Sequence, residues 1–169
     1  PRPAFEMYRA IQRPEAALAH MQKGWLSEKL DLYTERTREH LLEGQKLAAV
    51  DYLRAQYEKR LFSSAARAVL QRVDALFLPT LPVPAIPIAQ IDQEIVIEGV
   101  TKNATVSLMS LTMPFNLAGL PACSFPGGFT SHNLPIGLQV VGKAFEESTV
   151  LRIAHAYQQL TDWHRREIG

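Results

Sequence analysis

The longest regular pattern of apolar positions runs from residue 50 to residue 73. There an apolar side chain recurs every three or four positions, which is the period of an α-helix, so the segment predicts a long helix with one apolar stripe. The stripe consists of Val50, Leu53, Tyr57, Leu61, Ala65, Val69 and Val73. Off it lie the basic residues Arg54, Lys59, Arg60, Arg67 and Arg72. They indicate a solvated face rather than a phosphate site, since no glycine-rich loop accompanies them.

Two shorter helices are predicted before it. Pro14 suits the first turn of a helix that runs to about Trp25, because proline there gives up no donor that the helix needs. Asp31 or Thr34 can cap a second helix. Gly44 is a good left-handed residue to end that second helix.

After Asp74 the pattern changes to short apolar runs and prolines. Residues 75–78 suit a strand covered on both faces, and the proline-rich residues 79–87 suit a surface or pocket-edge loop. Residues 91–100 alternate in the manner of an edge hairpin, or belong to that loop.

A helix is expected within residues 101–111. Two further strands, 122–125 and 137–142, precede a last helix at 146–160, whose first residues are acidic. Strands joined through turns and helices favour an α/β or α+β arrangement of layers. A helical part (1–73), a strand and pocket-wall part (74–145) and the last helix are expected to make up one domain.

The composition narrows the class of protein. The chain has 169 residues, 47% of them hydrophobic, and a net charge of +1, which favours a folded domain and gives no support for a nucleic acid as partner. No apolar run is long enough to cross a membrane. The single cysteine gives no sign of an oxidising compartment, so a cytoplasmic location is expected. The histidine spacing predicts no metal site and the glycines form no phosphate loop, so no cofactor is expected.

The sequence offers no complete catalytic constellation of a familiar kind. No G-x-S-x-G nucleophile motif occurs. Cys123 falls in an apolar strand and is expected to be a small core residue, because reactive cysteines lie in exposed electropositive surroundings. Ser63 and Ser64 fall in the middle of the long helix, where backbone amides are used in helical hydrogen bonds and cannot hold an oxyanion.

Four blocks of sequence resemble the C-terminal part of the amidase signature family, in the same order and at fitting distances. They are GQKLAAVDYL (44–53), DALFLPTLP (74–82), PFNLAGLPACSFPGG (114–128) and LPIGLQVVGKAFEESTVLRIAHAY (134–157). The tail DWH (162–164) is also similar to that of the family. The resemblance covers essentially the whole chain.

The resemblance implies an α/β fold, the C-terminal portion of the amidase signature domain, with a mixed sheet flanked by helices. It implies hydrolysis of amide C–N bonds by two serines and a lysine that precede this chain, so that this chain carries no catalytic residue and is expected to be inactive alone. By the same resemblance, residues 101–115 form a pocket wall. Met109, Thr112 and Phe115 are candidates for binding the substrate, with ordinary core packing as the alternative.

The resemblance also bears on the substrate. Members of the family that hydrolyse glutamine within an amidotransferase hold the amino acid with an arginine and an aspartate. In this chain Glu39 or His40 stands in the place of the arginine, and Met109 stands in the place of the aspartate. A zwitterion would be poorly held without those charges. We therefore expect a small amide as substrate, with glutamine, the substrate of the amidotransferase A subunits, as the alternative substrate class. A non-catalytic truncated paralogue or a partner-binding subunit is the alternative to an enzyme.

The chain begins with Pro1, so we expect the reading frame to continue upstream. Without the rest of the domain, strand edges and apolar surface would be open. The isolated chain is therefore expected to form a homodimer or to aggregate.

Overall fold

The computed structural model describes residues 3–166, and the chain divides into two compact units, residues 1–62 and 63–169. The division falls inside the long helix α4 (Ala49–Leu70). The first unit is helical. The second contains the strands, so the predicted α/β class is confirmed.

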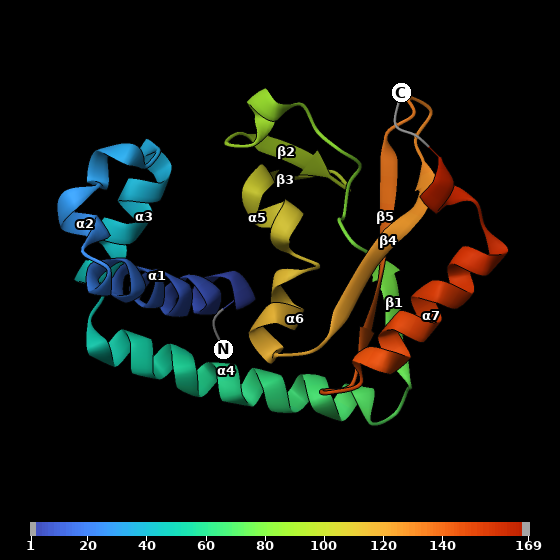
Figure 1. Ribbon diagram of the computed structural model, residues 1–169, viewed down its shortest axis with the longest axis horizontal. Helices are drawn as coiled ribbons and strands as arrows, with labels where there is room; N and C mark the ends of the chain where they lie inside the picture. Colours follow the sequence, from blue (N-terminus) through green and yellow to red (C-terminus); the bar gives the residue numbers. More distant parts are fainter. Residues whose placement is uncertain (1–2, 167–169) are drawn as a thin grey trace. The chain divides into compact units, whose positions relative to one another are not determined.

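In the first unit, α1 (Ala4–Gln22) lies against α3 (Glu35–Lys46), with α2 (Trp25–Glu28) and a 3₁₀ turn (Leu30–Leu32) between them (Figure 1). The buried side chains of these helices are mostly small or unbranched, which lets the two backbones approach closely. They are Met7, Ala10, Ile11, Ala17 and Leu41.

Two helix boundaries differ from those predicted. Pro14 lies inside α1 rather than at its start, because the helix already begins at Ala4; it costs the helix one backbone hydrogen bond without ending it. Gly44 lies inside α3 and is buried. A Cβ there would lie 2.2 Å from the Arg13 carbonyl oxygen, so glycine serves close packing here and does not end the helix. The cap at Thr34 is confirmed, since its side chain accepts a hydrogen bond from the Thr37 amide.

The predicted long helix is confirmed as α4, but its apolar stripe is exposed. An apolar stripe of this kind ordinarily packs on a core. Here the stripe residues other than Ala65 are between 43% and 64% exposed, and Ala65 is exposed as well. The buried residues of this helix are Ala55 and Leu70, on another face. The helix therefore presents a row of exposed apolar side chains along this stripe.

The second unit is built on a three-stranded antiparallel sheet. Its strand order is β1 (Ala75–Pro79), β5 (Pro135–Gly142) and β4 (Ala122–Phe129). Helix α7 (Glu147–Leu160) packs on one face of the sheet, as Figure 1 shows. The core between them is Phe125, Val140, Val150 and Ala154, and the half-buried Cys123 packs against it.

Strand β1 is less covered than its apolar sequence predicts. The sequence favours a strand buried on both faces, yet Phe77 is 52% exposed. The strand lies at an edge of the sheet and pairs only with β5 among the described residues. An edge strand has fewer neighbours to cover its side chains, which accounts for the difference.

A hairpin and two short helices connect β1 to β4. Strands β2 (Glu94–Ile97) and β3 (Val100–Asn103) confirm the hairpin predicted here. Its turn residues Glu98 and Gly99 both have positive φ, as a tight two-residue turn requires.

The hairpin shortens the helix that was predicted within 101–111. That helix, α5 (Ala104–Met109), begins only after β3. Helix α6 (Met113–Ala118) follows and ends at the left-handed Gly119. Two further 3₁₀ turns occupy Ile88–Gln90 and Trp163–Arg165.

Candidate functional site

The face of the sheet opposite α7 carries a buried glutamine, Gln139 of β5. It is 3% exposed, and its Nε2 donates hydrogen bonds to the carbonyl oxygens of Leu111, at 2.8 Å, and Pro79, at 3.2 Å. Leu111 lies between α5 and α6, and Pro79 ends β1. One side chain thus fastens two connecting segments to the central strand.

Two hydroxyls meet on the same face of the sheet. Residues directly opposite in antiparallel strands share a face, so Ser124 lies beside its partner Gln139. Its Oγ is 2.7 Å from Oγ1 of Thr80, across Gly137. A Cβ on Gly137 would lie 2.9 Å from Thr80 Oγ1, so the contact requires glycine there. The face combines hydroxyl and amide groups and differs in chemistry from the apolar face under α7.

The second unit also contains a cavity of about 340 Å³ between the β2–β3 hairpin and α5. Its lining residues are Pro82, Ile97, Lys102, Asn103, Val106, Ser107 and Ser110. Three hydrogen bonds connect α5 to the hairpin and to the residues just before it. The Asn103 side chain accepts from the Val106 amide at 3.0 Å, Thr105 donates its hydroxyl to the Ile91 carbonyl at 2.9 Å, and the Ala104 amide donates to the Gln93 carbonyl at 2.9 Å.

Ser107 is the other buried polar residue of the second unit. It is 4% exposed, and its Oγ has no hydrogen-bond partner among the described residues. A buried hydroxyl without a partner costs about 1–3 kcal/mol. Gln139 satisfies its amide group with two carbonyls, whereas Ser107 leaves a donor available beside the cavity.

The predicted binding residues are not among those that line this cavity. Met109 ends α5 and is half-buried, and the Thr112 hydroxyl donates to its carbonyl at 3.5 Å. Phe115 is half-buried in α6. The lining residues from this segment are Ser107 and Ser110, which sequence reasoning missed. The signal was present, since two serines three positions apart share a helix face.

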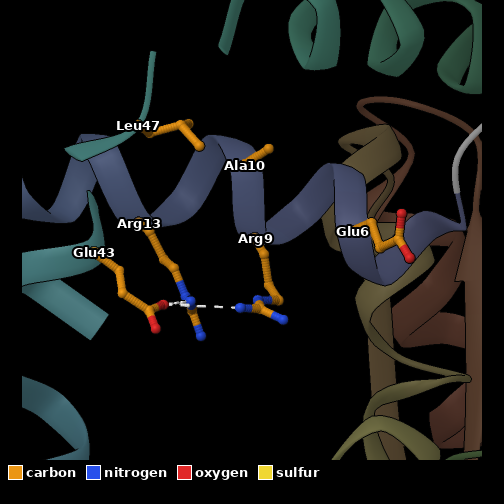
Figure 2. Close-up of a pocket in the computed structure, with 6 residues that line it drawn as sticks. All are labelled: Glu6, Arg9, Ala10, Arg13, Glu43 and Leu47. Atoms are coloured by element: carbon orange, nitrogen blue, oxygen red, sulfur yellow. Dashed lines mark ion pairs between the residues drawn. The ribbon is translucent and has the colours of Figure 1, made fainter. Parts of the chain in front are cut away.

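A second cavity, of about 310 Å³, lies in the first unit between α1 and α3 (Figure 2). Arg9 and Arg13, one turn apart on α1, both pair with the Glu43 carboxylate, and Glu6 also lines the space. The pKa of Arg13 is lowered by burial and by the charge of Arg9. Two cations and two carboxylates line this cavity, so its charges balance internally.

The remaining sequence candidates lie apart from both cavities. Ser63 and Ser64 are in mid-helix in α4, His132 is in a turn, and His155 is exposed on α7. Among residues 3–166, no three His, Cys, Asp or Glu side chains gather as metal ligands. None of the described helices is long and apolar enough to cross a membrane.

Comparison with known proteins identifies the family. The Amidase family model matches residues 8–151. The chain belongs to the amidase family. A solved amidase shares its fold with a TM-score of 0.84 and 32% identity, over 93% of this chain and 35% of that one. The amidase fold of the sequence-based expectation is thereby confirmed.

Curated relatives of this amidase chain include the A subunit of glutamyl-tRNA(Gln) amidotransferase. The protein of Synechococcus sp. (strain JA-2-3B'a(2-13)) is 43% identical over 116 residues, which are 68% of this chain and 21% of that protein. The protein of Myxococcus xanthus (strain DK1622) is 44% identical over 116 residues, 68% of this chain and 22% of that protein. The chain therefore spans about a fifth of the length of these relatives.

Proposed function

We propose that this chain is the C-terminal part of an amide hydrolase that cleaves the C–N bond of a small amide. In this proposal it supplies a wall of the substrate pocket, and the two serines and the lysine come from the part of the protein that precedes it. The family match over residues 8–151 supports amide chemistry in general. The single cysteine is in keeping with a cytoplasmic enzyme.

The observation that carries the proposal is the attachment of the α5–α6 segment to the sheet. Gln139 holds the carbonyl of Leu111, which lies between Met109 and Thr112. A residue that contacts a substrate must be held within a fraction of an ångström of its productive position. A buried amide bonded to the backbone at this point provides such a constraint. The chain's own role is therefore to position and enclose, and not to attack the carbonyl.

A second candidate function is the glutaminase step of a glutamine-dependent amidotransferase. The identity of 43–44% to the A subunits of such enzymes favours it. Against it stands Met109, which lies where the resemblance places an aspartate that grips the ammonium group of glutamine. A thioether offers no charge for an ammonium or a carboxylate. We therefore favour a substrate without an ammonium group at the position of Met109.

The test is to express the complete reading frame that contains this chain, and the 169-residue chain beside it. Ammonia release is measured with propionamide, benzamide and L-glutamine. We expect the complete protein to hydrolyse the small amides faster than glutamine, and the 169-residue chain to release no ammonia. A start codon directly before Pro1, or a complete protein without turnover on any amide, would replace this proposal with that of a non-catalytic, partner-binding protein.

A further inference from the structure

The cavity between the hairpin and α5 is lined by both apolar and polar residues. Pro82, Ile97 and Val106 are the apolar ones. Lys102, Asn103, Ser107 and Ser110 supply an ammonium, an amide and two hydroxyls. The cavity, of about 340 Å³, is large enough for a molecule with a short aliphatic body and a hydrogen-bonding end.

The charge of the lining is unbalanced. Lys102 pairs with Ile95 across the hairpin, and Val100 and Ile97 pair one step further along the same face. Glu94 pairs with Asn103 at the end of the hairpin, and Glu94 is not among the residues that line the cavity. Lys102 thus lies on a face shared with apolar residues. The lining contains one cation and no carboxylate.

The cavity of Figure 2 provides a contrast within the same chain. There Arg9 and Arg13 lie with Glu43 and Glu6, and Glu43 pairs with both arginines. Both arginines of that cavity already have a carboxylate partner within the protein. Beside Lys102, by contrast, the buried Ser107 hydroxyl has no partner among the described residues. The exposed ammonium of Lys102 and the buried, unused hydroxyl of Ser107 together suit an acceptor that carries negative charge.

We propose that this cavity binds the carboxylate group of a small aliphatic molecule, with Lys102 supplying the charge and Ser107 a hydrogen bond. The carboxylate has two possible sources. It is either the far end of an amide substrate or the free acid that amide hydrolysis releases. The relevance of both sources rests on the proposed function, whereas carboxylate binding itself does not.

Binding is tested with sodium butyrate and with butyramide, the uncharged molecule of nearly the same shape. Affinities are measured by titration calorimetry on the complete protein, in a carboxylate-free buffer of constant ionic strength. We expect butyrate to bind more tightly than butyramide. Lys102→Met should weaken butyrate binding about tenfold, the size of one lost charge-assisted contact, and leave butyramide binding unchanged.

The controls separate the cavity from general effects of charge and folding. Ser107→Ala removes the hydroxyl at nearly constant shape and should weaken butyrate binding a few-fold. Lys59→Met and Ser64→Ala, both on α4, are the same substitutions outside the cavity and should leave butyrate binding unchanged. Melting curves confirm that each variant folds. Equal affinity of butyrate and butyramide, or unchanged butyrate binding by Lys102→Met, would overturn the proposal.

The source of the carboxylate is determined from turnover. If the substrate carries it, Lys102→Met lowers kcat/KM for succinamate and leaves kcat/KM for butyramide unchanged. If the free acid is the ligand, butyrate inhibits butyramide hydrolysis, and Lys102→Met relieves the inhibition. Absence of turnover by the wild-type protein on both amides would contradict the proposed function, while the butyrate titration would still decide the binding site.

Discussion

At the scale of single residues, Gln139 and Ser107 show two outcomes of burying a polar side chain. Gln139 finds two backbone carbonyls from segments 60 and 28 residues away in sequence. Ser107 finds no partner within the described chain. Since buried polar groups are nearly always hydrogen-bonded, the first residue is interpreted as structural support and the second as a place for a ligand.

Replacement of Gln139 by leucine should destabilise the protein by about 2–4 kcal/mol, because two buried carbonyls would lose their donor while the side-chain volume changes little. Chemical denaturation measures the loss. Gln159→Leu, at an exposed position of α7, is the control and should change stability by less than about 0.5 kcal/mol. A Gln139→Leu variant as stable as the control would show that these hydrogen bonds contribute nothing net.

Residue-level prediction from the sequence succeeded in part. The resemblance led to the α5–α6 segment, and the cavity lies beside that segment. It did not indicate which face of α5 lines the cavity, because that depends on where the helix begins, and β3 takes the first residues that the pattern assigned to it. Met109, Thr112 and Phe115 remain predictions. Ser107 emerged only from its burial and from its lack of a partner.

At the scale of elements, the contact of α1 with α3 depends on the absence of a side chain at Gly44. A Cβ there would also lie 2.6 Å from the carbonyl carbon of Arg13 and 3.1 Å from the Cβ of Ala17. The obstacle is backbone, which cannot turn away as a flexible side chain can. The two helices are therefore held at a spacing that only glycine permits.

Gly44→Ala should lower stability by about 1–3 kcal/mol through this overlap. In an unobstructed helix the same change would raise stability by about 0.5–1 kcal/mol. The sign of the change in stability therefore shows whether the backbone of α1 obstructs a side chain at position 44. Thermal or urea unfolding of the variant is the measurement. Gln45→Ala, at the exposed neighbouring position, should be nearly neutral. A stabilised Gly44→Ala variant would contradict the close approach seen here.

Element types were predicted better than their ends. Helix and strand periods identified the long helix, the sheet strands and the last helix, because these depend on local patterns of apolar residues. The helix ends predicted from Pro14 and Gly44 were wrong, because each residue was interpreted from its local preference alone. Both residues lie inside helices that pack on each other, α1 and α3. The exposure of β1 and of the α4 stripe depends on neighbours that no local pattern describes.

At the scale of the whole molecule, two observations support the proposal that more of the amidase domain belongs with this chain. They are the exposed stripe of α4 and the fact that the chain spans only about a fifth of the length of its relatives. Each successive turn of this part of α4 exposes an apolar side chain. These side chains are Val50, Leu53, Tyr57 and Leu61. Contiguous apolar surface of this kind marks an interaction site or promotes aggregation. In the proposed enzyme, the rest of the amidase domain covers it.

The isolated chain should therefore associate as its concentration rises, into dimers or larger aggregates. Leu53→Lys combined with Leu61→Lys should reduce this association, because two charges would have to be buried in the contact. Light scattering over a dilution series measures it. Arg54→Ala combined with Arg60→Ala, off the stripe, is the control. A wild-type chain that stays a monodisperse monomer at all concentrations would contradict the prediction.

The two edges of the sheet are not equivalent. The β4 edge contains Pro126, which has no amide hydrogen, and a register shift between Pro126 and Gly128. Such features blunt an edge against further pairing. The β1 edge offers regular backbone from Ala75 to Leu78 before Pro79 interrupts it. At the β1 edge, about four residues of backbone are thus open to pairing with a further strand, so this edge is where the sheet can continue without crossing a bulge.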